Sequence, residues 1–285
     1  MAERKDMKKA IAVWVWSAAV LARSMLALIV LAAFVGAWAL AAYEWLWIPE
    51  SSVLVLVLSL AWAIGLVGAA TAALAGTSTS AMEAADEEAG ELSLASMIRF
   101  GGKRFAEGLL FVIAASFIGL ALDHIFVWVH QHSIEAASFL TLLLQKPVSY
   151  LLIDKCITVI AGLIGIAVAT SLLGFLMAIF GSGWKHACQR FGEVLLGGFF
   201  GLPFLSGVLS VVVFGGVAYQ LANWRPTVSA GLADYSQLGL RVALVLTLVA
   251  AGWFFWLLCL AWLDWVIPVE TVEPDDQDIP AGPEP

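Results

Sequence analysis

The sequence predicts an all-α, polytopic transmembrane helical bundle of about six spans. Of the 285 residues, 62% are hydrophobic and only 13% are charged, whereas soluble domains average roughly 45–50% apolar and 25% charged residues. About six apolar stretches cover most of the chain, and each is long enough to cross a bilayer as a helix. Little of the chain is left for a separate soluble enzyme domain.

The first apolar run is too long to form a single membrane-spanning helix. Residues 8–47 are almost continuously apolar and would form about 60 Å of helix, twice the hydrocarbon thickness. We expect residues 1–23 to form a cytoplasmic or interfacial helix, with Arg23 anchoring the first span, because a charge at the bilayer centre costs about 2.5–3.5 kcal/mol. A cleaved secretory signal is the alternative, since basic residues precede the apolar run.

Residues 24–267 are expected to form the six-span domain. We place the spans near residues 24–47, 53–76, 105–129, 155–180, 191–221 and 239–266. A cytoplasmic loop is expected at residues 77–97. Pro203 is expected to kink the fifth span, because proline removes one backbone hydrogen bond and clashes with the preceding turn.

Two further elements follow from composition. Residues 132–145 are rich in leucine and precede Pro147, which predicts a short interfacial helix on the outer side that ends before the proline. Residues 268–285 combine proline, glycine and acidic residues and are expected to form a disordered, acidic cytoplasmic tail.

Basic residues predict the orientation. Ten fall in segments on one side of the predicted membrane and four on the other, and basic loops stay in the cytoplasm. The ten are Arg4, Lys5, Lys8, Lys9, Arg23, Arg99, Lys103, Arg104, Lys185 and Arg190. We therefore expect a multi-pass cell-membrane protein, of bacterial inner-membrane type, with both termini inside.

A short polar pattern occurs twice. Arg99-x4-Arg104-Phe-Ala-Glu107-Gly-Leu-Leu is echoed by Lys185-x4-Arg190-Phe-Gly-Glu193-Val-Leu-Leu. Each base and acid are three residues apart at an expected helix start, which favours an anchor at the headgroups. Arg104, Glu107, Arg190 and Glu193 are therefore the predicted topology anchors. The echo also suggests a parallel duplication of a two-span hairpin, with repeat units near residues 53–130 and 148–222.

The predicted bilayer centre contains no acid, base or histidine. Proton-coupled transporters, ion pumps and voltage sensors need ionisable groups within the membrane, so these classes are disfavoured. The central polar groups are hydroxyls, which normally hydrogen-bond to their own helix or bridge to a neighbour. They are Ser59, Thr71, Ser116, Ser171, Ser206 and Thr247.

Small residues recur at four-residue spacing on three spans, which lets helix backbones approach closely. The patterns are Gly68-x3-Ala72-x3-Gly76, Ala161-x3-Gly165-x3-Ala169 and Gly197-x3-Gly201. They indicate either a compact bundle or a protein partner that packs on these faces.

One group of residues has metal-binding chemistry. Asp123, His124, His130 and His132 gather at the outer end of the third span, and imidazoles with a carboxylate are ligands for zinc or copper. On one continuous helix these side chains point in different directions. A metal site would therefore require the helix to end near Val129 and the chain to fold back.

The sequence favours a non-enzymatic integral membrane protein, a structural, scaffolding or accessory subunit of a membrane assembly. We expect no cofactor and no nucleic-acid partner; the expected partners are membrane lipids and a protein bound through the small-residue faces. The alternatives are a permease or channel for a neutral or lipophilic solute and, third, a metalloprotein that uses the outer histidines.

Overall fold

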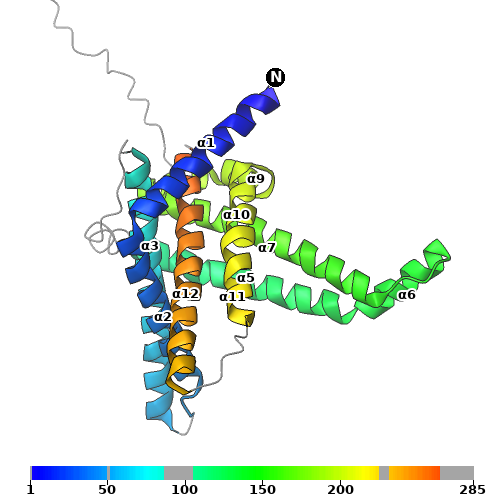
Figure 1. The fold of residues 1–285 in the computed structure, drawn as a ribbon, viewed down its shortest axis with the longest axis horizontal. Coiled ribbons are helices and arrows are strands. Elements are labelled where there is room, and N and C mark those ends of the chain that lie inside the picture. The colour runs from blue at the N-terminus through cyan, green and yellow to red at the C-terminus, as the bar shows by residue number, and fades with distance from the viewer. Residues whose placement is uncertain (1, 50–51, 87–104, 225–230, 264–285) are drawn as a thin grey trace, which may run out of the picture.

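The computed structural model describes residues 2–49, 52–86, 105–224 and 231–263. Helices make up 93% of these residues, and no strand occurs among them (Figure 1). Six helices are long and apolar enough to cross a membrane. The expected all-α class is confirmed, and the number of helices suited to span a membrane matches the expected six.

The N-terminal apolar run divides into two helices at Ser24. Helix α1 comprises Ala2–Arg23 and α2 comprises Met25–Leu46, and α1 is not among the candidate spans. Buried residues of α1 recur every three or four positions, at Ala10, Val13, Ser17 and Val20. This spacing places them on one helix face, and that side of α1 packs against α12.

Helix α3 comprises Val53–Asp86 and is ten residues longer than the expected span. The prediction that residues 77–86 belong to a loop is wrong. The hydroxyl of Thr77 donates to the carbonyl of Ala73 at 2.7 Å, and that of Thr79 donates to Ala75 at 2.8 Å. Because these hydroxyls are hydrogen-bonded within the helix, this part of α3 can pack into the protein interior, where Thr77 is 1% exposed. Ser78 is also fully buried, and its hydroxyl has no hydrogen-bond partner among the described residues. Residues 87–97 of the expected loop lie outside the described residues.

The next three helices form a hairpin. Helix α5 comprises Phe105–Gln131, α6 comprises Ser133–Leu144 and α7 comprises Tyr150–Ser182. The short helix expected within residues 132–145 is confirmed as α6. It ends at Gln145, which adopts a left-handed conformation with φ 54°, two residues before Pro147.

The expected fifth span is divided into separate helices. After α8 (Trp184–Gln189), helix α9 comprises Phe191–Phe200 and α10 comprises Leu202–Ser210. The chain is extended at Gly201, and Pro203 occupies the first turn of α10, where a missing N–H costs no hydrogen bond. The kink expected at Pro203 is therefore a complete break two residues earlier.

After this break, α10 continues without interruption into a π-helical turn, η1 (Val211–Gly215), and then into α11 (Gly216–Asn223). This continuous segment, Leu202–Asn223, is the fifth candidate span. Helix α12 comprises Gly231–Trp262 and packs against α2, α3 and the α10–α11 segment. The tail from residue 264, including residues 268–285, lies outside the described residues.

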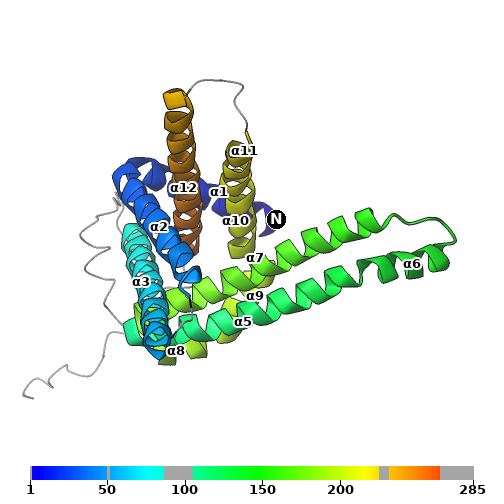
Figure 2. The same ribbon diagram turned by 90° about the horizontal axis from the view of Figure 1, so that it is seen from below.

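The helices form two regions, which we name the hub and the arm. The hub consists of α1, α8 and α9 with the adjoining ends of α3, α7, α10 and α12. The arm consists of residues 117–131 of α5, all of α6 and residues 150–164 of α7. Figure 1 shows α2, α3, α11 and α12 extending from the hub toward the same end of the molecule, with the arm leaving at a steep angle to them, and Figure 2 shows α11 and α12 diverging from α2 and α3.

Burial separates the two regions sharply. The largest hydrophobic cluster lies in the hub and includes Met177, Ile179 and Phe254, each at most 2% exposed. The arm is apolar on its outside, with Phe117 at 68% and Leu142 at 80% exposure. Helix α7 contains both environments, because its residues from Ala167 to Phe180 are mostly buried and its first half is mostly exposed.

Glycine permits the closest helix contacts of the hub. A Cβ added at Gly207 of α10 would lie 2.6 Å from the Trp256 ring, and one added at Gly252 would lie 2.8 Å from Phe214. On α9, an added Cβ at Gly198 would meet the Ser171 backbone of α7, 2.9 Å from its Cα. Real Cβ atoms do not approach so closely, so these contacts require glycine.

Candidate functional site

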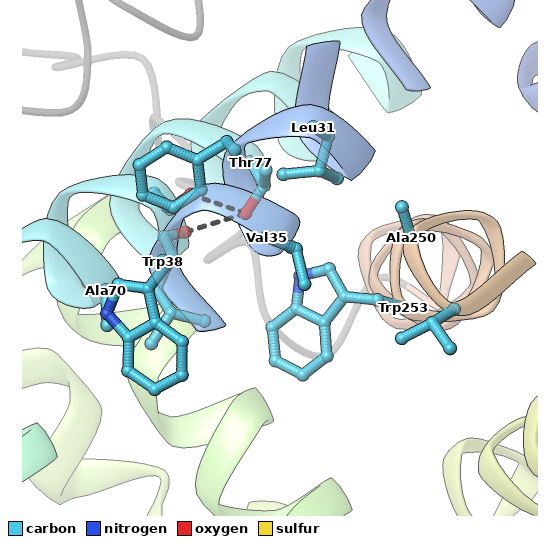
Figure 3. A pocket seen from close by; sticks show the side chains of 11 residues that line it. Leu31, Val35, Trp38, Ala70, Thr77, Ala250 and Trp253 are labelled. Carbon is cyan, nitrogen blue, oxygen red and sulfur yellow. Dashed lines mark hydrogen bonds between the residues drawn. The ribbon is translucent and has the colours of Figure 1, made fainter. Parts of the chain in front are cut away.

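An apolar pocket of about 430 Å³ lies between α2, α3 and α12. Figure 3 shows Trp38 of α2 and Trp253 of α12 pointing into it beside Val35. Its other lining residues are small or aliphatic, apart from Phe34 and one hydroxyl residue; they are Leu31, Ala70, Ala73, Leu74, Thr77, Val249 and Ala250. We name this cavity the lateral pocket.

The hydroxyl of Thr77 and the indole N–H of Trp38 at the lateral pocket are already hydrogen-bonded within the protein. The Thr77 hydroxyl donates to backbone carbonyls of its own helix, at 2.7 Å to Ala73 and 3.2 Å to Leu74. The indole N–H of Trp38 donates to the carbonyl of Leu66 at 2.9 Å. The pocket therefore presents hydrocarbon to an occupant, and a polar solute would lose its hydration there without compensation.

A second apolar cavity of about 230 Å³ lies between α3, α5 and α7, with Trp253 of α12 in its wall. It shares Leu74 and Trp253 with the lateral pocket. These two side chains therefore separate one cavity from the other. A change of rotamer at either residue would alter both cavities.

The predicted metal-binding residues do not meet at one point. His130 pairs with Asp154 of α7, at 2.7 Å between Nδ1 and Oδ1. The Nδ1 of His132 hydrogen-bonds the Trp128 carbonyl at 2.8 Å, and its ring stacks on that indole. Asp123 and His124 lie about two turns earlier on α5, and Asp123 is exposed.

Helix α5 ends at Gln131, two residues beyond Val129, and the chain folds back through α6 and α7. Within residues 2–49, 52–86, 105–224 and 231–263, no three histidine, cysteine or acidic side chains gather as metal ligands. The metal-ligand hypothesis for Asp123, His124, His130 and His132 therefore gains no geometric support.

The antiparallel hairpin explains the pair that forms instead. Helices α5 and α7 pack side by side, so the last residues of α5 face the first turns of α7. This brings His130 next to Asp154, a residue that lies 24 positions further along the chain. The contact between His130 and Asp154 could have been predicted by aligning the end of α5 with the start of α7, with α6 as the connection between them.

The repeated polar pattern has two different structural roles. In the second copy, Arg190 and Glu193 approach within 3.9 Å across the start of α9, with Glu193 exposed. In the first copy, Glu107 accepts a hydrogen bond from the backbone N–H of Trp184 at 3.2 Å. Glu107 therefore links α5 to the first residue of α8, at the head of the second copy. Arg104 lies outside the described residues.

The central hydroxyls behave as the sequence indicated. Thr71, Ser116, Ser171, Ser206 and Thr247 each donate to a carbonyl four residues earlier, at 2.7–3.0 Å. The sixth, Ser59, accepts from the indole N–H of Trp45 at 3.0 Å. Because five of the six hydroxyls donate their protons to helix carbonyls and the sixth accepts from an indole, these groups do not form a ready path for a polar solute.

The small-residue faces divide between packed and open positions. On α3, Gly68 lies near Phe105 of α5, and Gly76 is buried. On α7, an added Cβ at Gly162 or Gly165 would meet no atom within 4 Å. On α9 the contact is made by Gly198 rather than by Gly197, where an added Cβ would face open space.

No family model matches the chain, and no curated protein or solved structure is significantly similar to it. The assignment of function therefore rests on the six apolar helices, the hub, the arm and the lateral pocket. These features are compatible with a multi-pass integral membrane protein.

Proposed function

We propose that this chain is a non-enzymatic integral membrane protein that acts as a structural or accessory subunit of a membrane assembly. In this arrangement the six candidate spans cross the cell membrane, with the arm tilted relative to the other spans, both termini are cytoplasmic and the hub lies at the cytoplasmic side. The excess of basic residues in the predicted inner segments supports this orientation.

One observation carries the proposal. Helix α7 is mostly buried from Ala167 to Phe180, yet Gly162 in the arm and Gly165 at the base of the arm face open space. Open glycines weaken an isolated helix without a packing gain, whereas in a membrane they allow a second helix to approach closely. The arm is therefore suited to receive a helix from a partner protein.

The first prediction tests this partner contact. A photoreactive amino acid at Leu163, which is 41% exposed between the two glycines, is expected to cross-link one protein partner in native membranes. The matched control is the same amino acid at Leu56, which is 54% exposed on the outer half of α3 and is expected to give lipid adducts.

The variant Gly165→Leu is expected to abolish the cross-link from position 163 while the protein stays folded, because the added side chain would meet no atom of this chain within 4 Å at its Cβ. Lipid adducts alone from both positions would contradict the proposal. So would a protein adduct that persists unchanged in Gly165→Leu.

A permease for a lipophilic solute is the second candidate. The observation that favours it is the pair of apolar cavities separated by Leu74 and Trp253, because a solute could pass from one to the other when these side chains move. A polar neutral solute has less support, since the central hydroxyls are already hydrogen-bonded.

A further inference from the structure

We propose that the lateral pocket is a phospholipid site, which takes one acyl chain between α2, α3 and α12 while Arg23 holds the lipid phosphate. This inference does not depend on the role of the arm. Four observations support it: the apolar lining of the pocket, the side on which the pocket opens, its distance along α2 from Arg23, and the positive charge just before that helix.

The chemistry of the pocket selects hydrocarbon. The eleven lining residues include one hydroxyl, on Thr77, and that hydroxyl donates to its own helix. A cavity lined by apolar side chains does not hold water and takes apolar ligands. Its volume of about 430 Å³ lies within the usual range of roughly 300–1,000 Å³ for sites that bind small ligands.

The pocket opens sideways rather than into the hub. Phe34 and Trp38 line it, and each is 37% exposed, while Ala250 at its inner wall is 1% exposed. Around the candidate spans, the medium that reaches such an opening is the acyl region of the bilayer. A chain from a neighbouring lipid can therefore enter without crossing a polar layer.

The distance along α2 from Arg23 to the pocket matches the distance from the phosphate of a cytoplasmic-leaflet lipid to its acyl chain. Arg23 ends α1 at the corner before α2. With 1.5 Å of rise per residue, Leu31 lies about 12 Å and Trp38 about 22 Å further along the helix. Half of a bilayer, headgroups included, measures about 20–22 Å. A lipid phosphate at Arg23 would therefore place its acyl chain at the level of the pocket.

The charge at this corner is complementary to a phospholipid. Arg23 is exposed, and guanidinium groups bind phosphate oxygens through paired hydrogen bonds. A basic residue near a membrane surface contributes about 1 kcal/mol to the binding of anionic lipid. The headgroup contact therefore adds to the burial of the acyl chain.

The test uses the full chain in dodecyl maltoside, titrated with phosphatidylglycerol that carries bromine in the outer half of its acyl chains. Bromine quenches tryptophan fluorescence at short range, and Trp38 and Trp253 line the pocket. We expect saturable quenching near one lipid per chain. Quenching that rises without saturation would overturn the proposal.

Two variants locate the site. Ala70→Phe fills the pocket and is expected to weaken binding at least about tenfold, whereas its matched control Ala121→Phe, on the exposed side of α5, is expected to bind as the wild type does. Arg23→Gln is expected to weaken binding about fivefold. Equal binding by the two phenylalanine variants, or no change with Arg23→Gln, would overturn the assignment.

A third variant keeps the test decisive if Ala70→Phe does not fold. Trp38→Phe preserves an aromatic ring in the pocket but removes one quenched fluorophore. The amplitude of quenching at saturation is expected to fall below that of the wild type. An unchanged amplitude would place the bound lipid away from Trp38 and would overturn the proposal.

Discussion

Phe254→Ala is expected to lower the free energy of unfolding by roughly 2–3 kcal/mol, the larger of the two effects that we predict on stability. Phe254 lies on α12 within the hub cluster and is 1% exposed. The substitution removes about 100 Å³ of side chain, and a buried cavity costs about 24 cal/mol per Å³ that it leaves open.

The membrane lowers the expected cost below that of a soluble core. The usual penalty for Phe→Ala of about 3–5 kcal/mol includes transfer of the ring from water to protein. In a bilayer the surroundings of an unpacked helix are as apolar as the hub, so the cavity term remains and the transfer term largely disappears.

Unfolding by titration with dodecyl sulfate in mixed micelles measures this effect. The control is Phe117→Ala, at a phenylalanine that is 68% exposed on α5 and whose loss is expected to change the stability by at most about 0.5 kcal/mol. Equal losses of stability in the two variants would show that the hub is not the packed core of the molecule.

Gly198→Ala is expected to cost about 1–3 kcal/mol, the range for overpacking a close contact. Gly198 is buried on α9 against Ser171 of α7, and a new Cβ would lie 2.9 Å from the Ser171 Cα. A side-chain hydroxyl can rotate away, but a backbone atom can yield only if the two helices separate.

The neighbouring glycine supplies the control. Gly197 lies on the same helix, and an added Cβ there would meet no atom within 4 Å. Gly197→Ala is therefore expected to be neutral or to stabilise α9 by up to about 1 kcal/mol, because alanine restricts the unfolded chain and favours helix. The same dodecyl sulfate titration compares the two, and a reversed order would contradict the described packing of α9 on α7.

Composition and length were enough to predict the helices. Each of the six candidate spans overlaps an expected one, because an apolar run of that length has few structural alternatives in a membrane. Helix α6 could also be predicted, since leucines before Pro147 define both its character and its end. The ends of helices inside the hub were harder to predict. The expected end of α3 at residue 76 was wrong because Thr77 and Ser78 are buried in the helix-packed interior.

The break at Gly201 shows a different limit. Apolar residues continue without interruption from Val194 to Val217 apart from small residues and Pro203, so hydropathy cannot distinguish one span from two helices. The separation depends on how Gly198 docks α9 against Ser171, which is a tertiary contact. For the same reason, the spacing of small residues predicted a helix contact at Gly197, whereas the contact is made by Gly198.

The candidate sites could be predicted only in part. The outer histidines were recognisable as a cluster, but the partner of His130 is Asp154 on another helix. The lateral pocket was missed, although Trp38 and Trp253 offered a signal. Both lie within spans, away from the interfacial positions that tryptophan usually occupies, and such a tryptophan needs a packing partner or a cavity.

Cysteine accessibility in intact cells tests the central claim most directly, namely that the α5–α7 arm crosses the membrane from a cytoplasmic hub. With Cys156, Cys188 and Cys259 replaced, single cysteines are placed at Glu135 of α6 and Lys185 of α8, which are both exposed. An impermeant maleimide is expected to label position 135 in intact cells and position 185 only after permeabilisation. Labelling of both positions from the same side would contradict the account, because the arm would then lie along the membrane surface.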